Sequence, residues 1–334
     1  MPARIRTVVD PRFPVELARF RTARGLSLRD LAALAHCGKS YLGDLESGRT
    51  RPTCEAATHL DDLLGAGGVL AAMVVDAPPV TTPDDDQRLA HVIAHPNRLD
   101  GESVRLLADV LAAQRRLDDA LPAPMMLPWS VPQWRTAHDL AVNARGAHAD
   151  ALREVAAEWT QFVGWLHAEA RNDTEAVRVL AEATEEADAL DSGLLAAQAL
   201  NFRGYLERQR GNPRGIVRYF LAAFHTPGAS PLQRVGDAIQ AAHGYALLGD
   251  RTTAVRLLGE ASDLTESAED AEPPGAAYWL SPTFSRMGLG LAYLALGDRT
   301  AADNLRAGLA GLPADQRDAE WTHEYRRALV SATG

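Results

Sequence analysis

Cysteine and lysine are scarce in this chain, which has two cysteines, Cys37 and Cys54, and a single lysine, Lys39. We interpret both cysteines as small, buried, unpaired residues, while a redox switch between them stays the alternative. Also missing are a charged-then-apolar leader and an apolar run of about 18 residues, the length that spans a membrane. We therefore expect a cytoplasmic protein with no membrane contact.

Motifs of catalysis and cofactor binding are also missing. The chain has no P-loop, no G-x-S-x-G elbow and no H-E-x-x-H zinc motif. His91 and His95 stand four residues apart on a predicted helix, but no third metal ligand is near them in the sequence. The neighbouring carboxylates Asp61-Asp62 and Glu185-Glu186 fall on helix faces that we predict to be solvated. We expect no enzyme activity, no cofactor and no metal site.

Charge is distributed unevenly along the chain. Acidic residues outnumber basic ones by 44 to 34, and the net charge of −10 argues against nucleic acid when it is taken over the whole chain. Residues 1–75, however, hold ten basic and eight acidic residues, so the acidic excess lies in the remainder. An acidic remainder repels DNA and would confine any DNA binding to the N-terminal part.

The first 75 residues carry the start and stop signals of short helices. Pro14 favours the first turn of one helix, and Ser27 with Asp30 three residues later is typical of the cap of a second. Cys37-Gly38 ends that helix, and we expect Gly38 to adopt the positive φ that such a break uses.

Three further helices are predicted before residue 76. One covers 39–47 and ends at Gly48 in the position that favours glycine. Thr53 caps the next, and residues 69–75 form a fifth apolar segment. Five short helices around one small core are what a helical DNA-binding domain of this size needs.

Residues 14–75 resemble the lambda-repressor/Cro-like helix-turn-helix domain of Xre-type transcriptional regulators. The resemblance is carried by Gly25-Leu26-Ser27, Leu31-Ala32, Leu42, Leu45-Glu46-Ser47-Gly48 and Arg51-Pro52. It implies a five-helix domain whose third helix, the recognition helix, lies in the major groove of DNA. Gly43 departs from the pattern, because glycine inside a helix costs ~1 kcal/mol relative to alanine. It either permits close approach to DNA or is simply tolerated.

The same resemblance implies which residues meet DNA. Positions early in the recognition helix face bases, and the loop that follows touches phosphate. The candidate residues are Ser27, Arg29, Lys39, Ser40, Tyr41, Asp44, Arg49, Thr50 and Arg51. The alternative for Lys39 is an exposed helix residue without a base contact. The resemblance also implies a pair between Arg21 and Glu46 across the domain.

Proline and aspartate mark a boundary after the first domain. Residues 76–86, DAPPVTTPDDD, predict a semi-rigid linker. We therefore divide the chain into a helix-turn-helix domain at 10–75, a linker at 76–86 and a helical domain at 87–334. Within the last, residues 121–134 contain four prolines, so we expect an irregular connection there and not one helix.

A weak internal repeat follows residue 150. In four segments a small residue precedes a turn by seven positions, and an apolar residue follows that turn by five. The triplets are Gly164, Arg171 and Ala176; Gly204, Gly211 and Ile216; Ala242, Gly249 and Ala254; and Gly290, Gly297 and Ala302. We predict four helical hairpins over 152–313, further helices over 87–150, and a last helix near 315–331.

This repeat resembles tetratricopeptide repeats, although its period is longer and irregular. The chain as a whole resembles actinobacterial Xre-type regulators with a C-terminal repeat array. The resemblance implies an all-α protein whose repeat domain forms a superhelix with a concave face. Candidate effector-pocket residues on that face are Trp165, Gln198, Asn201, Phe202, Arg203, Tyr205, Gln240 and His243. The alternatives for them are packing between helices, for the aromatic residues, and a solvated surface, for the polar ones.

Two functional hypotheses result. The first is a transcriptional regulator that binds a palindromic DNA operator as a homodimer and is controlled by a peptide or small-molecule effector. The alternative is an interaction scaffold whose repeat domain recruits a protein partner, with a minor role in DNA binding.

Overall fold

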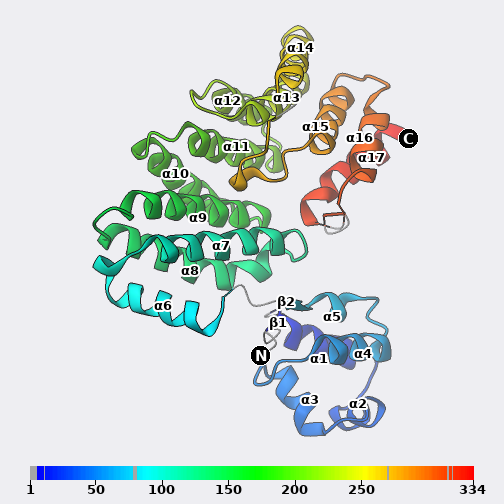
Figure 1. Cartoon of the computed structure of the whole chain (residues 1–334). Coiled ribbons are helices and arrows are strands. Elements are labelled where there is room, and N and C mark those ends of the chain that lie inside the picture. Colours follow the sequence, from blue (N-terminus) through cyan, green and yellow to red (C-terminus); the bar gives the residue numbers. More distant parts are fainter. Residues whose placement is uncertain (1–5, 11, 78–80, 269–270, 314–315, 318) are drawn as a thin grey trace. The chain divides into compact units, whose positions relative to one another are not determined.

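The computed structural model describes residues 6–10, 12–77, 81–268, 271–313, 316–317 and 319–334. The chain divides into two compact units, residues 1–86 and 87–334, and the division falls in the first turn of a helix (Figure 1). Both units are helical, which confirms the all-α fold class. No helix within the described ranges combines the length and the apolar character that crossing a membrane requires.

Unit 1 contains the five predicted helices. Its elements are β1 (Arg6–Val9), α1 (Phe13–Ala23), α2 (Leu28–Leu34), α3 (Lys39–Glu46), α4 (Cys54–Leu64), α5 (Val69–Ala72) and β2 (Val74–Ala77). The predicted caps are present: Ser27 and Asp30 form a reciprocal capping box, and the Thr53 hydroxyl accepts a hydrogen bond from the Ala56 N–H. Gly48 has the positive φ, 71°, expected of it.

Two local predictions in unit 1 are wrong. The fifth helix ends at Ala72, and the β-branched residues after it form β2, which pairs antiparallel with β1 so that Val74 lies opposite Val9. Gly38 has a φ of −73°, and His36 takes the positive φ instead, at 49°. The Cys37 N–H then bonds the Ala32 carbonyl at 3.0 Å, so the positive-φ residue that ends α2 lies two positions before the glycine.

A paired arginine and glutamate connect α1 to α3. Arg21 Nε lies 2.6 Å from Glu46 Oε1, and Arg21 Nη2 lies 2.9 Å from Glu46 Oε2. Arg21 also donates to the Leu26 carbonyl at 2.7 Å. This confirms the pair that the resemblance implied. Since both side chains are largely buried, the two-point contact fixes the end of α3 relative to α1.

One of the carboxylates predicted to be solvated is instead part of the core of unit 1. Asp61 is buried and accepts hydrogen bonds from the backbone N–H groups of Gly68, Leu70 and Ala71. These N–H groups belong to the start of α5, which is otherwise short of acceptors. Asp61 therefore caps α5 from a neighbouring helix.

Unit 2 is an array of helices in sequence order. They are α6 (Pro83–Ala94), α7 (Gly101–Asp118), α8 (Ala123–Asn143), α9 (Ala149–Glu169), α10 (Asp173–Ala189), α11 (Gly193–Gln209), α12 (Pro213–Phe224), α13 (Pro231–Leu247), α14 (Arg251–Ser267), α15 (Pro282–Ala295), α16 (Ala301–Ala310) and α17 (His323–Thr333). Short 3-10 turns cover Pro96–Arg98, Gly275–Ala277 and Glu320–Thr322. Of the expected linker, residues 76–77 belong to β2 and 83–86 to α6, while 78–80 lie outside the described residues.

The expected irregular connection at 121–134 is wrong, because residues 123–143 form the continuous helix α8. Three of its prolines recur every four residues and share one exposed face, at Pro124, Pro128 and Pro132. Carbonyls that lose their helical partner there can bond to water. The opposite face buries Met126 and Trp134, and this packing outweighs the cost of the prolines.

The four predicted hairpins are confirmed as α9–α10, α11–α12, α13–α14 and α15–α16. All four predicted turn residues have positive φ: Arg171, Gly211, Gly249 and Gly297. The fourth apolar position is off by one, since Ala301 is buried and Ala302 is only half-buried. The last helix is α17, and of the expected range 315–331, residues 315 and 318 lie outside the described residues.

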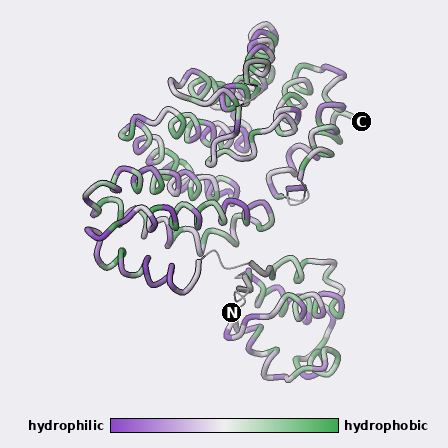
Figure 2. The backbone as a smooth tube through the Cα atoms, in the orientation of Figure 1, coloured by the Kyte–Doolittle hydropathy of each residue, from purple (hydrophilic) through white to green (hydrophobic). Residues whose placement is uncertain are grey.

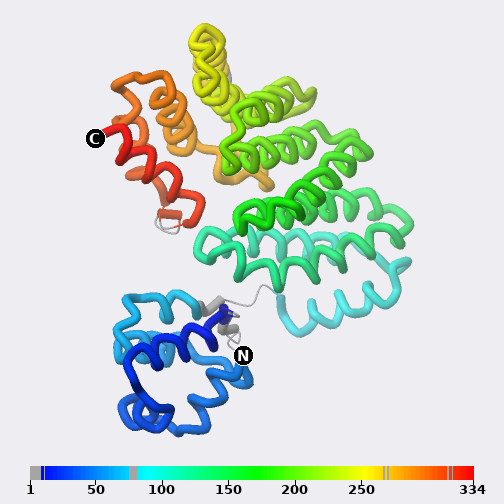
Figure 3. Tube along the Cα trace, turned by 180° about the vertical axis from the view of Figure 1, so that it is seen from behind, coloured from blue at the N-terminus to red at the C-terminus, as the bar shows by residue number. Residues whose placement is uncertain are grey.

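The helices of unit 2 form two rows. Helices α7, α9, α11, α13, α15 and α17 pack in succession against one another, and α8, α10, α12, α14 and α16 pack against members of that row from the other side (Figures 1 and 3). Hydrophilic and hydrophobic stretches alternate along most helices (Figure 2), as expected where one face of each is covered. The first row carries the candidate effector residues.

The cost in stability of Gly43, in the middle of α3, can be measured directly. A Cβ built there meets no heavy atom within 4 Å, so alanine fits without strain. We expect Gly43→Ala to raise the free energy of unfolding of unit 1 by about 0.5–1 kcal/mol, measured by urea denaturation. Gly204→Ala is a comparison of opposite sign in unit 2, whose unfolding free energy it should lower, because its Cβ would lie 2.7 Å from the Phe220 ring. A loss of stability in Gly43→Ala would contradict the prediction.

Candidate functional site

The exposed surface around α2 and α3 contains most of the candidate DNA residues. Ser27, Arg29, Lys39 and Ser40 are exposed, and the last two stand in the first turn of α3. The Ser27 hydroxyl is already used, because it accepts the Asp30 N–H at 3.2 Å. The cationic groups among these four exposed residues are those of Arg29, in α2, and Lys39, in α3.

Tyr41 and Asp44 are less available than their neighbours. Tyr41 is half-buried against the core of unit 1, and this burial raises the pKa of its hydroxyl. Asp44 is ion-paired with Arg49, with Asp44 Oδ1 and Arg49 Nη2 at 2.8 Å. Its backbone carbonyl also accepts the N–H groups of Arg49 and Thr50, at 2.9 and 3.2 Å. These contacts fix the loop that follows α3.

The ion pairs of this surface leave an excess of positive charge. Among the described residues, Arg29, Lys39 and Arg51 make no ion pair, while Arg49 is neutralised by Asp44. Arg51 is exposed in the loop after α3. An exposed surface with unpaired cations at the start of a helix and in the next loop can bind a polyanion such as DNA phosphate.

Unit 2 contains a cavity on the first row of helices, with a volume of about 860 Å³ counted to its open mouth. Ten aromatic side chains line it: Phe162, Trp165, Phe202, Tyr205, Phe220, Tyr278, Trp279, Phe284, Trp321 and Tyr325. Its polar and charged lining residues are Arg115, Asp118, Asp119, Asn201, Arg208 and Gln240. The 860 Å³ includes open solvent, and the centre of a water-sized sphere can occupy about 70 Å³ of it.

Five of the eight candidate effector residues line this cavity, namely Trp165, Asn201, Phe202, Tyr205 and Gln240. The other three lie elsewhere. Gln198 is buried and accepts a hydrogen bond from Gln233, and Arg203 donates to the Tyr219 hydroxyl at 3.0 Å. His243 is buried, and this burial with the nearby charge of Arg208 lowers its pKa to about 3.

The repeat pattern did not single out the segments that close the cavity. Tyr278, in the connection between α14 and α15, donates to Asp119 Oδ2 at 2.7 Å and to the Arg115 carbonyl at 2.8 Å. Trp279 stacks on Phe202, with ring centroids 5.6 Å apart. Tyr278 and Trp279 lie outside the repeated triplets. The sequence signal for their role is that two adjacent aromatic residues occur in a connection between helices.

Arg208 is the buried cation of the cavity wall. It contacts Glu324 Oε2 at 3.1 Å, the Gln240 side-chain oxygen at 2.6 Å and the Tyr325 hydroxyl at 3.4 Å. Burial acts to lower the pKa of Arg208, but Glu324, Tyr325 and Tyr205 together outweigh it and the net shift of the pKa is upward. Arg208 thereby joins α11 to α17 across the cavity.

Two acids of this region are held by neutral donors. The Trp165 indole N–H donates to Asp118 Oδ2 at 2.8 Å, and the Tyr205 hydroxyl donates to Glu169. Burial raises the pKa of Asp118 well above its usual value and that of Glu169 to about 7. Asp118 is half-buried and lines the cavity.

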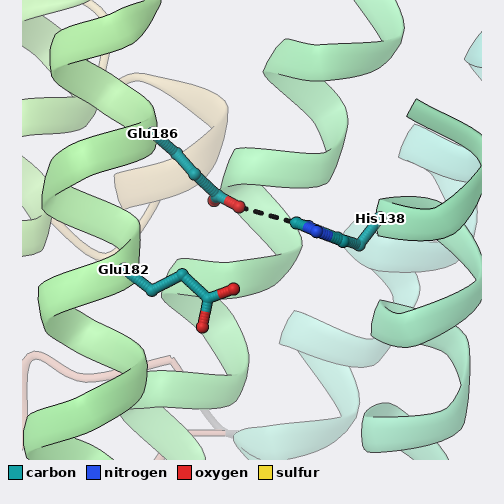
Figure 4. A group of neighbouring side chains, drawn as sticks. All are labelled: His138, Glu182 and Glu186. Carbon is teal, nitrogen blue, oxygen red and sulfur yellow. Dashed lines mark ion pairs between the residues drawn. The ribbon is translucent and has the colours of Figure 1, made fainter. Parts of the chain in front are cut away.

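A second polar group joins α8 to α10 (Figure 4). His138 Nδ1 lies 3.3 Å from Glu186 Oε1, and Glu182 stands one turn before Glu186 on the same helix face. The three side chains could each offer one atom to a metal ion. Glu186 is thus not on a solvated face, and burial raises the pKa of its carboxyl. The sequence could not indicate this group, because its histidine lies on another helix.

The other candidates for special chemistry have ordinary surroundings. The rings of His91 and His95 stack with centroids 4.7 Å apart on exposed positions of α6 and the residue after it. Neither Cys37 nor Cys54 forms a disulfide, and both are half-buried, where full burial was expected. The Cys54 thiol donates to the Val74 carbonyl at 3.3 Å.

Comparison with known proteins identifies one part of the chain. Residues 13–73 match a family described as a helix-turn-helix domain. The chain is similar to the crystal structure of Bacillus thuringiensis PlcR in complex with the peptide PapR7 and DNA, at 11% identity and a TM-score of 0.43. That similarity covers 96% of this chain and 99% of PlcR. No curated protein matches the chain.

The burial of Glu169 makes stability depend on pH. Its pKa is about 7 in the folded chain against an ordinary 4.5, so folding favours the protonated form. The stabilisation is complete below pH 4.5 and is lost as pH rises to about 7. We expect the wild type to lose on the order of 2 kcal/mol relative to Glu169→Gln over this interval. Urea denaturation at several pH values, with exposed Glu185→Gln as control, measures it; parallel curves would contradict it.

Proposed function

We propose that the chain is a DNA-binding transcriptional regulator that reads DNA with the surface around α2 and α3. The single observation that carries the proposal is the exposed start of α3 and the following loop, with unpaired Lys39 and Arg51, in a unit matching a helix-turn-helix domain at 13–73. In such domains the second helix of the motif enters the major groove and flanking groups hold the phosphates.

We further propose that two copies act together. One small helical domain contacts few base pairs, so specificity is gained when a homodimer binds a palindrome with half-sites about one helical turn apart. Selection of bound sequences from a random DNA pool tests this. Enriched inverted repeats support a dimer, and an enriched single half-site bound by a monomer contradicts it.

We propose that unit 2 supplies the control of DNA binding by accepting a peptide or small-molecule effector. The support for this role is the cavity on the first row of helices, whose lining is rich in aromatic side chains and includes a few polar and charged ones. An effector can shift DNA affinity only if its own affinity differs between the DNA-bound chain and the DNA-free chain.

The cationic residues of unit 1 predict a salt-dependent DNA affinity. Lys39→Ala and Arg51→Ala should each weaken binding about 3- to 10-fold and reduce the slope of log affinity against log salt by about one, since each removes a cation next to phosphate. Fluorescence anisotropy with a labelled duplex between 50 and 200 mM salt measures both. Arg214→Ala removes an exposed cation from unit 2 and should change neither. Equal effects from all three variants would contradict the site.

The ion pair between Asp44 and Arg49 predicts a gain of affinity. Asp44→Asn removes a negative charge from α3 and releases Arg49, which is now bonded to it at 2.8 Å. We expect non-specific duplex DNA to bind about 3- to 10-fold more tightly, with less discrimination between sequences. The same anisotropy assay, with a selected and a scrambled duplex, measures this. Unchanged or weaker binding to the scrambled duplex would show that Arg49 does not reach DNA.

A further inference from the structure

The cavity of unit 2 gathers half of the aromatic residues of the chain. Ten of the twenty phenylalanines, tryptophans and tyrosines line it, although aromatics make up only 6% of the sequence. Trp165 lies between Phe202 and Tyr205, with ring centroids 5.0 and 4.6 Å away. Several of these rings keep partial exposure toward the cavity, so packing of the core does not use all of their surface.

The cations of the cavity wall are already neutralised. Arg115 Nη1 lies 2.7 Å from Glu158, and Arg208 is bonded to Glu324 and Gln240. An anionic ligand would have to displace Glu324 from Arg208 before it gained a counter-charge. The charges of the wall therefore disfavour a carboxylate or phosphate ligand.

Neutral groups donate hydrogen bonds to both acids of the wall. Asp118 accepts from the Trp165 indole N–H at 2.8 Å, and Asp119 accepts from the Tyr278 hydroxyl at 2.7 Å and from Gln316 at 3.2 Å. Burial raises the pKa of Asp118 well above its usual value, with the charge of Asp119 adding to the effect. Carboxylates in an aromatic enclosure are a site that a cation would stabilise.

We propose that this cavity binds an organic cation, a protonated amine or a guanidinium on an apolar body. The charged group lies at Asp118 and Asp119, and the apolar body packs against the rings around Trp165. This inference rests on the proposed effector role of unit 2 and names the chemistry of the ligand. Aromatic rings attract cations through their faces, and an acid at the end of the enclosure adds a charge-assisted hydrogen bond.

The walls of the cavity come from segments far apart in the sequence. Tyr278 reaches across to α7, and Arg208 joins α11 to Glu324 of α17. A ligand bound between them would contact both the connection before α15 and the C-terminal helix. The same chemistry could be presented by a free small amine or by a basic side chain of a short peptide, and the two are separated by experiment.

The test uses the full chain and three phenylalkyl probes of similar size that differ in charge. Calorimetric titration with 2-phenylethylamine, 3-phenylpropionate and 3-phenylpropanol compares a cation, an anion and a neutral group. We expect the amine to bind at least about tenfold more tightly than the other two. A blocked tripeptide with lysine between two phenylalanines forms a fourth arm. If the tripeptide binds more tightly than the amine, the ligand is a peptide with a basic side chain. If the amine binds more tightly, the ligand is a small amine.

Asp118→Asn keeps an oxygen for the Trp165 N–H and removes the charge. We expect it to weaken amine binding at least about tenfold and leave binding of the alcohol unchanged, which also shows that the variant is folded. Glu185→Gln, an exposed acid of the same unit, is the matched control. The inference is overturned if no amine binds saturably, if the anion binds as tightly as the amine, or if Asp118→Asn binds the amine as the wild type does.

Failure of the inference and failure of the proposed function are distinguishable. DNA affinity measured without any probe tests the regulator role alone. If the amine binds at Asp118 and leaves DNA affinity unchanged, the effector role is refuted while the ligand class stands. If DNA affinity is normal and no cation binds, the regulator role stands and the ligand class is refuted.

Discussion

The close crossing of paired helices is the constraint on which unit 2 depends. A Cβ at Gly164 would lie 2.5 Å from Leu180, one at Gly204 would lie 2.7 Å from Phe220, and one at Gly290 would lie 2.5 Å from Leu305. Each contact sets the distance between the two helices of a hairpin. Because the first helices of the hairpins also pack on one another, these distances fix the row on which the cavity is built.

Local chemistry made much of the fold predictable from the sequence. Capping boxes, positive-φ turns and helix periodicity depend on residues a few positions apart, so the cap at Ser27 and the turn at Arg171 could be located. The failures came where tertiary structure overrides such signals. His36 takes the strained φ that Gly38 could have taken more easily, and α8 continues through prolines because they face water and the opposite face is buried.

The cavity was only partly predictable. Trp165, Phe202 and Tyr205 could be proposed because they lie on first helices of the repeat pattern, which mark the inner row. Tyr278 and the pairing of Arg208 with Glu324 could not, because they join segments more than a hundred residues apart that share no repeat. Burial of charge is likewise invisible in the sequence, as Asp61 and Asp118 illustrate.

The uniqueness of Lys39 has a practical consequence for chemical labelling. It is the one lysine of the chain and it is exposed in the first turn of α3. Amine-reactive dyes and crosslinkers therefore have a single side-chain target, positioned on α3, and no engineered cysteine is needed. A short bifunctional reagent attached there would report which macromolecular surface lies within its reach in a native extract, and reductive methylation would enlarge the same group while keeping its charge.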